Sequence, residues 1–503
     1  MTTPSLDDSQ APTLESLAQA FFKRAVDVPI VEYEKRWYSY GELGEIAQQL
    51  RTQLAASQAN ANAPIAFAPR NRPSALAILL ALIAESRPIH MIYAFQSSAG
   101  IARDLTSLQP AVLIAYAQDI SDEVRSTAKD NGTALLVIDD EGIRGEPGLT
   151  RVAQRTPTSP TVQREIQILT SGTTGAPKRF PVPYTLIANY LTRGRALFAS
   201  HGAKLSQIPP VLLSFPLGNI TGIYSTVPTL LLGQRVVLLD RFTLDGWLDH
   251  VRRFQPAQTG LPPSGIQMIL DADVPKADLA CIQSLGTGAA PLDPGVQQEF
   301  ESRYNIPILL SYGATEFGGR VTAMTPEMHR VWGQSKLGSV GKPVPGARIR
   351  VVDPGTHQVL PDNQEGLLEV VSPHVGPEWI RTTDIGLVDS DGLVFLHGRA
   401  DGAITRGGFK ILPEAIERAL AKHPAVYEAA VVGLPDRRLG QVPAAAVQLK
   451  QGVEPPSIET LAAHLRLHLL ATHIPVHWRF VDALPRTPST KIHRPGVRAL
   501  FAA

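Results

Sequence analysis

The stretch IAFAPRNRPSALAILLALIAESRPIHMIY, residues 65–93, sets the architecture of the first part of the chain. It opens with a short apolar run, IAFA, and closes with a second one, IHMIY. Between them, residues 75–84 form an unbroken apolar segment that follows Pro73 and Ser74, two residues that favour the start of a helix. A strand, a buried helix and a second strand in this order predict a βαβ unit, and therefore a parallel sheet.

The same alternation recurs along most of the chain. Apolar runs predict further strands at 111–115, 134–138, 166–169, 211–214, 230–239, 281–285 and 306–310, and a helix is expected at 185–197. From 338 to 398, short apolar runs are broken by turns such as PVPG and DSDG, which indicates antiparallel hairpins. After about residue 401, helices at 413–423 and 458–471 and strands at 429–432 and 444–449 predict a smaller α+β section.

Composition excludes several classes of protein. The 503 residues contain 47 Lys+Arg and 46 Asp+Glu, so the net charge of +1 disfavours a nucleic-acid or membrane-surface binder driven by charge. The longest apolar run is far shorter than the roughly 20 residues that span a bilayer. Cys281 is the one cysteine, which excludes an intrachain disulfide, and it reads as a small core residue in an apolar strand. The polar N-terminus does not look like a signal peptide, so we expect a cytoplasmic protein, and a homodimer is left open.

The segment TSGTTGAPK, residues 170–178, has the composition of a phosphate-binding loop. Its glycines let the backbone approach an anion, while its hydroxyls and its lysine offer hydrogen bonds and charge. The spacing is not that of a Walker A motif. By composition alone, a plain polar loop between a strand and a helix explains it equally well.

Further motifs give this loop a context. They are SYGATE at 311–316, RTTDIG at 381–386, GRAD at 398–401, RGGFK at 406–410 and LPRTPSTKI at 484–492. Together with TSGTTGAPK, and in this order, they resemble the core motifs of the adenylate-forming superfamily, which includes acyl-CoA synthetases, amino-acid adenylation domains and firefly luciferase. The resemblance covers nearly the whole chain.

The resemblance implies a set of roles for individual residues. Lys491 is implied as the catalytic lysine, Thr315 as a contact of the α-phosphate and Glu316 as the ligand of Mg²⁺, a cation that prefers oxygen ligands. Tyr312 is implied to stack on adenine. Asp384 and Arg399 are implied to bind the ribose hydroxyls. The remaining residues implied for ATP or AMP are Thr170, Ser171, Gly172, Thr173, Thr174, Gly175, Lys178, Gly288, Ala289, Ala290, Pro291 and Gly313. Those implied for the acyl pocket are Asn219, Gly260, Phe317 and Gly318, those for the path of CoA are Gly407 and Gly408, and the hinge is Asp401.

Four positions depart from the usual pattern of the superfamily. Asn219, in FPLGNITG, stands where many CoA ligases carry a histidine, which bears on how the thiol is delivered. Thr383 and Thr490 replace common glycines, and Thr405 replaces a common lysine. The segments implied for the acyl pocket are mostly apolar or small and offer no Asp for an α-ammonium group. A hydrophobic fatty or aromatic acid is therefore favoured over an amino acid.

We therefore expect an α/β fold with a large N-terminal domain, 1–398, built of parallel-sheet α/β subdomains and a small β-rich subdomain. A small α+β C-terminal domain, 402–503, is expected to follow a hinge at 399–401. The expected activity uses ATP and Mg²⁺ to convert a small-molecule carboxylic acid to acyl-AMP, and then passes the acyl group to CoA. The alternatives are transfer to a carrier protein or an amine, closure of a β-lactone, and an inactive adenylate-binding protein.

Overall fold

The computed structural model describes residues 12–94, 96–139, 142–153, 163–170, 178–200, 208–288, 290, 292–406, 409–436, 439–487 and 490–502. These residues fall into two compact units. Among the described residues, the first unit takes in those up to 170, 178–259 and 275–282, and the second takes in 260–274 and those from 283 onward. No helix in the described ranges combines the length and the apolar character needed to cross a membrane.

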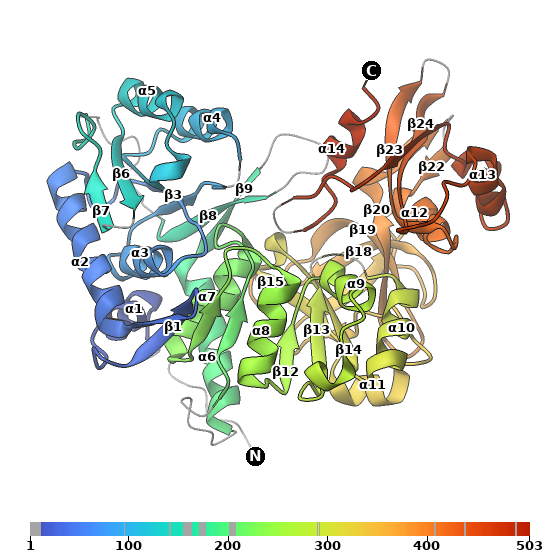
Figure 1. Ribbon diagram of the computed structural model, residues 1–503, viewed down its shortest axis with the longest axis horizontal. Helices are drawn as coiled ribbons and strands as arrows, with labels where there is room; N and C mark the ends of the chain where they lie inside the picture. The colour runs from blue at the N-terminus through green and yellow to red at the C-terminus, as the bar shows by residue number, and fades with distance from the viewer. Residues whose placement is uncertain are drawn as a thin grey trace. The chain divides into compact units, whose positions relative to one another are not determined.

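The first unit is built on a seven-stranded sheet of order β7-β6-β5-β3-β4-β8-β9 (Figure 1). Its five central strands are parallel, and β7 and β9 run antiparallel at the two edges. The strands are β3 (Ile65–Ala68), β4 (Ile89–Met91), β5 (Val112–Tyr116), β6 (Ala134–Asp139), β7 (Gly142–Gly145), β8 (Glu165–Thr170) and β9 (Lys178–Pro183). The parallel sheet predicted from residues 65–93 is thus confirmed.

Helices cover both faces of this sheet, which explains why β3 and β5 at its centre are buried at every position. Alternate residues of β3, Ile65 and Phe67, pack with α2 (Tyr40–Ser57) and α3 (Pro73–Ala84). The intervening Ala66 and Ala68 pack with α4 (Ser98–Leu108) and α5 (Asp122–Asn131). Helix α3 is buried almost throughout, as its unbroken apolar sequence predicts. Figure 1 shows α4 and α5 on the side of the sheet opposite α3.

A second sheet of the first unit has the order β10-β11-β1-β2. Strands β10 (Val211–Leu213), β11 (Val236–Leu238) and β1 (Pro29–Tyr33) are parallel, and β2 (Arg36–Ser39) pairs antiparallel with β1. The other helices of this unit are α1 (Leu14–Phe21), α6 (Tyr184–Ser200), α7 (Ile220–Leu232) and α8 (Leu244–Phe254). The loop between β10 and α7 carries the predicted acyl-pocket residue Asn219, so this sheet fixes where that residue stands.

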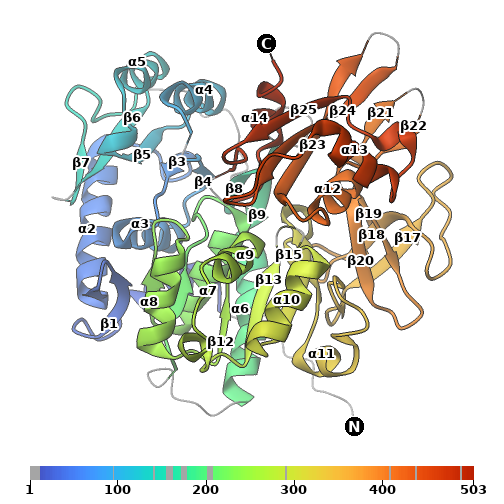
Figure 2. The same cartoon turned by 45° about the vertical axis from the view of Figure 1, so that its right-hand side comes forward.

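The second unit contains three sheets (Figure 2). The first has the order β12-β13-β14-β15-β16, in which β13 and β14 are parallel and β15 and β16 are antiparallel additions. Its strands are β12 (Gln258–Gly260), β13 (Ser284–Gly288), β14 (Ile308–Ala314), β15 (Gly319–Ala323) and β16 (Lys342–Pro343). The helices that accompany it are α9 (Pro263–Asp271), α10 (Pro294–Tyr304) and α11 (Pro326–Trp332).

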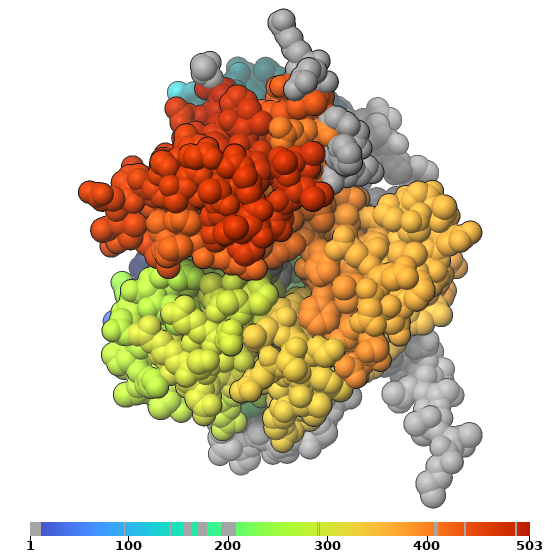
Figure 3. All heavy atoms as spheres, turned by 90° about the vertical axis from the view of Figure 1, so that its right-hand side faces the viewer, coloured from blue at the N-terminus to red at the C-terminus, as the bar shows by residue number. Residues whose placement is uncertain are grey.

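The second sheet of this unit is an antiparallel meander, β17-β18-β19-β20, as the turn-rich sequence from 338 to 398 predicts. Its strands are β17 (Arg348–Val352), β18 (Gly366–Val371), β19 (Ile380–Val388) and β20 (Val394–Arg399). Figure 3 shows one face of this unit with all atoms as spheres, coloured from yellow-green to red along the chain. Strands β19 and β20 carry the motifs RTTDIG and GRAD, so those two motifs lie on neighbouring strands.

The third sheet belongs to the C-terminal α+β section that the sequence predicts. It consists of β21 (Ile404–Arg406), β22 (Phe409–Ile411), β23 (Val426–Asp436), β24 (Gly440–Leu449) and β25 (His477–Val481). Helices α12 (Pro413–Ala421) and α13 (Ile458–Arg466) pack on one face through residues such as Val431 and Ala445. Helix α14 (Arg494–Ala499) packs on the other face, where Val432 and Ala444 point.

Three local predictions are wrong. Residues 230–239 do not form one strand, because α7 continues to Leu232 and Gly233, at φ 85°, ends it before β11 begins at Val236. Periodicity alone cannot separate a buried helix end from a buried strand. Helix α13 ends at Arg466 and does not reach residue 471. Cys281 lies in a turn before β13 and is half-buried, so it is not a core residue of a strand. The domain boundary at 399–401 stays a prediction.

Candidate active site

Two residues implied to bind ribose face each other across a pair of strands in the second unit. Asp384 on β19 is the register partner of Arg399 on β20, and the two side chains approach to 3.5 Å. The Asp384 side chain is 16% exposed. Burial raises the pKa of this carboxyl group, while a hydrogen bond from Tyr312 and the charge of Arg399 oppose that shift. The result is a carboxylate that is held in place and only partly accessible to solvent.

Tyr312 orients this carboxylate from a different sheet. It lies near the end of β14, is 7% exposed, and donates its hydroxyl to Oδ2 of Asp384 at 2.5 Å. Burial and the neighbouring carboxylate raise the pKa of the phenol, so it remains a donor. Its ring also packs edge-on against Phe317, with 5.6 Å between ring centroids. Sequence reasoning implies stacking on adenine for Tyr312 and misses its link to Asp384.

Arg399 also joins the ribose residues to the predicted hinge. Its Nε and Nη2 atoms donate to the two carboxylate oxygens of Asp401 at 2.9 and 2.8 Å. The pair closes over a single 3-10 turn, Ala400–Gly402, which directly follows β20. This paired hydrogen bond is the main reason that the pKa of Arg399 is raised. Tyr312, Asp384, Arg399 and Asp401 therefore form one hydrogen-bonded series, which we call the ribose cluster.

The residues implied for phosphate and metal follow β14 in one short turn. Thr315 and Glu316 lie in the 3-10 turn Thr315–Phe317, and Gly318 ends it in the left-handed region at φ 63°. The hydroxyl of the buried Ser372 donates to the carbonyl of Phe317 at 2.5 Å and so fixes the last residue of this turn. Glu316 is exposed and forms neither a hydrogen bond nor an ion pair with any described residue. A free carboxylate with one hydroxyl beside it fits Mg²⁺ that takes its other ligands from phosphate and water.

Lys491 stands on a tight turn of the C-terminal section. The carbonyl of Lys491 accepts from the amide of Thr487 at 2.7 Å, and its own amide donates to the Thr487 hydroxyl at 3.2 Å. The Lys491 residue is exposed to solvent. The protein around its ammonium group nevertheless desolvates it and so lowers its pKa, and the charge of Arg399 lowers the pKa further. Thr490 has φ 64°, a conformation that favours glycine. The departure from the usual glycine thus places a β-branched residue in a strained position beside Lys491.

The segment implied for adenine is described only in part. Gly288 ends β13, and a Cβ atom there would come within 2.7 Å of the Ser311 hydroxyl, so the strand pair itself requires a glycine. Gly313 is required similarly, because a Cβ atom would lie 2.4 Å from the carbonyl of Gly319. Ala290 and Gly260 are also placed in the second unit. The predicted residues that lie outside the described ranges are Ser171, Gly172, Thr173, Thr174, Gly175, Ala289, Pro291, Gly407 and Gly408. Thr170 ends β8 and Lys178 begins β9, which pair with each other.

Asn219 lies in the first unit, at the start of α7. Its side-chain carbonyl accepts from the amide of Gly222 at 2.7 Å and so caps the helix. The residue is half-buried, which leaves its amide nitrogen as the group available to a ligand. Sequence reasoning found this position through its departure from the family pattern but did not foresee the cap. It also missed Asn71, a buried residue that holds the preceding loop.

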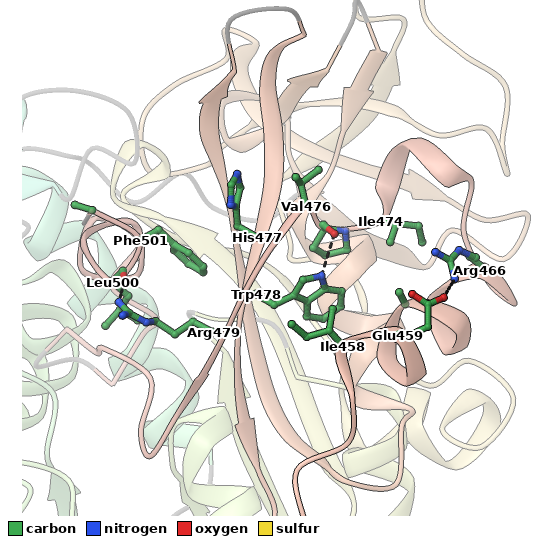
Figure 4. A pocket seen from close by; sticks show the side chains of 13 residues that line it. Ile458, Glu459, Arg466, Ile474, Val476, His477, Trp478, Arg479, Leu500 and Phe501 are labelled. Atoms are coloured by element: carbon green, nitrogen blue, oxygen red, sulfur yellow. Dashed lines mark hydrogen bonds and ion pairs between the residues drawn. The ribbon is translucent and has the colours of Figure 1, made fainter.

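The lining of a groove in the C-terminal section contains none of the predicted site residues (Figure 4). It is lined by α13, β25 and the segment after α14, and its Trp478 donates to the carbonyl of Pro475 at 3.0 Å. Arg466 at its rim is paired with Glu459 at 2.6 Å. Among the described residues, His, Cys, Asp and Glu do not gather in threes as a metal site would require.

Comparison with known proteins places the chain in a family. Residues 18–378 match the AMP-binding enzyme family, and residues 415–491 match the AMP-binding enzyme C-terminal domain. The first match covers more than half of the chain. The chain therefore belongs to the AMP-binding enzyme family, as the resemblance of its motifs implied.

Individual relatives agree with this assignment. The indoleacetate–CoA ligase of Aromatoleum aromaticum is 28% identical over an alignment of 503 positions, which covers 94% of this chain and 95% of that protein. The fatty acid–[acyl-carrier-protein] ligase ScoC of Streptomyces coeruleorubidus is 28% identical over an alignment of 430 positions, which covers 75% of this chain and 80% of that protein. The ATP-bound structure of MatB from Rhodopseudomonas palustris has a TM-score of 0.79 at 23% identity and covers 97% of this chain and 99% of that chain, which supports the α/β fold.

Proposed function

We propose that this protein activates a hydrophobic carboxylic acid, fatty or aromatic, with ATP and then transfers the acyl group to the thiol of CoA. The observation that carries the proposal is the ribose cluster, in which a half-buried carboxylate, a phenol and a guanidinium group are already oriented to bind vicinal hydroxyls. The cluster occurs in a chain of the AMP-binding enzyme family. The indoleacetate–CoA ligase, which aligns along almost the whole chain, supports an aromatic acid and CoA as the acceptor.

The first half-reaction needs charge and position. The acid carboxylate attacks the α-phosphorus of ATP, the bond to the bridging oxygen breaks, and pyrophosphate leaves with that electron pair. Asp384, held by Tyr312, accepts from the ribose hydroxyls and so fixes the nucleotide. Thr315 offers a hydroxyl to the α-phosphate, and Lys491 supplies positive charge as negative charge gathers there. Glu316 would hold Mg²⁺, which when bound neutralises charge on the phosphates.

The second half-reaction transfers the acyl group. We propose that the C-terminal section turns about Asp401, withdraws Lys491 and brings Gly407 and Gly408 beside the path of the thiol. The thiol loses its proton, its sulfur attacks the acyl carbon, and AMP leaves. A turn about one or two boundary residues is a common way to switch an active site between two tasks. The domains 1–398 and 402–503 and the hinge at 399–401 are part of this proposal, as are a cytoplasmic location and a homodimer.

The test is acid-dependent exchange of pyrophosphate into ATP over a panel of fatty, aryl and amino acids. Exchange with hydrophobic acids and none with amino acids is the expected result. Addition of CoA to the best acid, followed by mass spectrometry of the products, should yield the thioester and AMP. Exchange with no acid in the panel would leave an inactive adenylate-binding protein as the better description.

A second acceptor has specific support. The relative ScoC transfers a fatty acid to an acyl carrier protein, and it aligns with three quarters of this chain. If exchange occurs but no CoA thioester forms, the same assay with a phosphopantetheinylated carrier protein tests this acceptor. A product whose mass is that of the acid less water would indicate lactone closure instead.

A further inference from the structure

The loop between β10 and α7, residues 214–219, is held in one conformation by contacts of its own backbone. We call it the acyl loop, because it carries Asn219. The amide of Asn219 donates to the carbonyl of Pro216 at 3.1 Å, which closes a tight turn. A Cβ atom at Gly222 would lie 2.0 Å from that same carbonyl, so the first turn of α7 presses directly against the loop. The position of Asn219 therefore depends on the backbone of residues 215–217.

Asn71 anchors that backbone from another part of the first unit. It follows β3 and is 1% exposed. Its side-chain nitrogen donates to the carbonyl of Phe215 at 3.0 Å and to that of Leu239, just after β11, at 3.1 Å. Its side-chain oxygen accepts from the amide of Leu217 at 3.0 Å. One side chain thus fastens the acyl loop at two points and joins it to the end of β11.

The chemistry of these contacts selects an amide. Two carbonyls need donors and one amide needs an acceptor, and a carboxamide of this size supplies both from one buried site. Aspartate would keep the acceptor but place a negative charge beside two carbonyl oxygens. Alanine would remove the partners of three backbone groups, one in a buried contact and two in part-buried contacts, and each loss carries a desolvation cost. The loop would then lose the two side-chain contacts that tie it to the rest of the first unit and would keep only its own backbone turn.

We propose that Asn71 is a positioning residue that sets the acyl loop, and through it Asn219, so that it controls discrimination among acids. This inference rests on the proposed function, in which Asn219 borders the acyl pocket. Asn71 acts on the acid through the loop and has no role toward the nucleotide. Its loss is therefore felt in the KM for the acid and in the ratio of kcat/KM values between acids, while the KM for ATP stays unchanged.

The experiment compares Asn71→Ala and Asn71→Asp with wild type in the exchange assay over the acid panel. Because small misplacements at a site cost one to two orders of magnitude, kcat/KM for the best acid should fall about tenfold or more, with the KM for ATP within about twofold. Asn131→Ala is the matched control. Asn131 is also buried and donates to a carbonyl, that of Leu105, but it ties α5 to α4. It should lose stability without any change in acid selectivity.

Two results would overturn the inference. One is an Asn71 variant with a lower melting temperature but an unchanged acid profile, as for Asn131→Ala, which would make Asn71 merely structural. The other is an equal rise in the KM values for acid and ATP. If both variants fail to fold, Asn71→Ser, which keeps one donor and one acceptor, takes their place in the same comparison. Absence of exchange in wild type and in Asn131→Ala together would count against the proposed function itself. In that case, amide hydrogen exchange still decides the positioning role: faster exchange at 215–223 but not at β5 supports it, and no change there refutes it.

Discussion

The bond from Tyr312 to Asp384 can be removed with little change in shape by Tyr312→Phe. The ring and its contact with Phe317 remain, and only the hydroxyl is lost. A hydrogen bond to a charged group contributes about 1.5–3 kcal/mol. The bond exists before the nucleotide binds, so this value sets an upper bound on what binding can lose; at 1.4 kcal/mol per tenfold change in an equilibrium constant, that bound is about ten- to a hundredfold in nucleotide affinity. Arg399 still approaches Asp384 and water can replace the phenol, so the lower end of that range is expected.

The assay is acid-dependent ATP–pyrophosphate exchange with either substrate varied. The KM for ATP should rise about tenfold, by the arithmetic above, while the KM for the acid stays near its wild-type value. The matched control is Tyr304→Phe, which removes the hydroxyl of another buried tyrosine of the second unit. That hydroxyl donates to the backbone carbonyl of Val274 at 3.0 Å and should not affect the KM for ATP.

The pH profile separates orientation from simple loss of stability. Asp384 must be ionised to accept from the ribose hydroxyls, its pKa is raised by burial, and the hydrogen bond from Tyr312 lowers it. Without that bond the pKa rises further, so the acid limb of kcat/KM for ATP should move to higher pH in Tyr312→Phe. A variant whose KM for ATP and acid limb both match those of wild type would refute the reasoning, because the bond would then do nothing for the nucleotide.

Four other perturbations have defined outcomes. Lys491→Ala should abolish exchange yet spare thioester formation from preformed acyl-AMP; equal loss of both in a folded protein contradicts its role. Compared with Asp401→Ala, which removes the same bonds to Arg399 without stiffening the backbone, Asp401→Pro should slow thioester formation more than exchange in rapid-quench measurements of each half, and the reverse order contradicts a hinge there. Thr490 has a left-handed φ of 64° and its hydroxyl accepts from Ser264 at 3.2 Å. Thr490→Gly and Thr490→Ala both lose that bond, so relief of the strain should make the glycine variant the more stable by roughly 1 kcal/mol, visible as a higher melting temperature; an equal or lower one refutes the strain. The pKa of Lys491 is lowered, so its charged form is lost at a lower pH than that of a fully solvated lysine. The exchange rate should therefore begin to fall at a lower alkaline pH. Lys491→Arg, if active, should remove this alkaline decline, because arginine stays charged.

Sequence reasoning succeeded where the signal is local. The order of strand, helix and strand in residues 65–93 becomes β3, α3 and β4, because apolar runs of these lengths have few other ways to be buried. The antiparallel meander followed from closely spaced turns. The prediction of a single strand at 230–239 is wrong because one apolar run there contains both the end of a helix and a strand. The left-handed conformation of Gly233 separates the two.

The candidate site was predictable as a set of residues but not as a set of contacts. Motifs name Tyr312 and Asp384, but 72 positions separate them in the chain, and no pattern in either motif says that one hydroxyl meets one carboxylate. The pairing of Asp384 with Arg399 depends on the register of β19 and β20, which a bulge shifts between Ile385 and Gly386. A sequence alone therefore gives the chemical groups of such a site, whereas the register and the sheet order decide which groups act together.

Asn71 illustrates the same limit more sharply. It stands in a loop whose sequence, PRNRPS, predicts only the entry to a helix, and its partners Phe215 and Leu239 lie 144 and 168 positions away. The Asn71 side chain bonds only to backbone groups, which every residue type offers. The amino-acid types of its partners therefore carry no signal of the contact. Residues of this kind have to be found by asking which buried polar side chains hold the loops of a site. Asn71 is such a residue, and the conformation of the acyl loop depends on it.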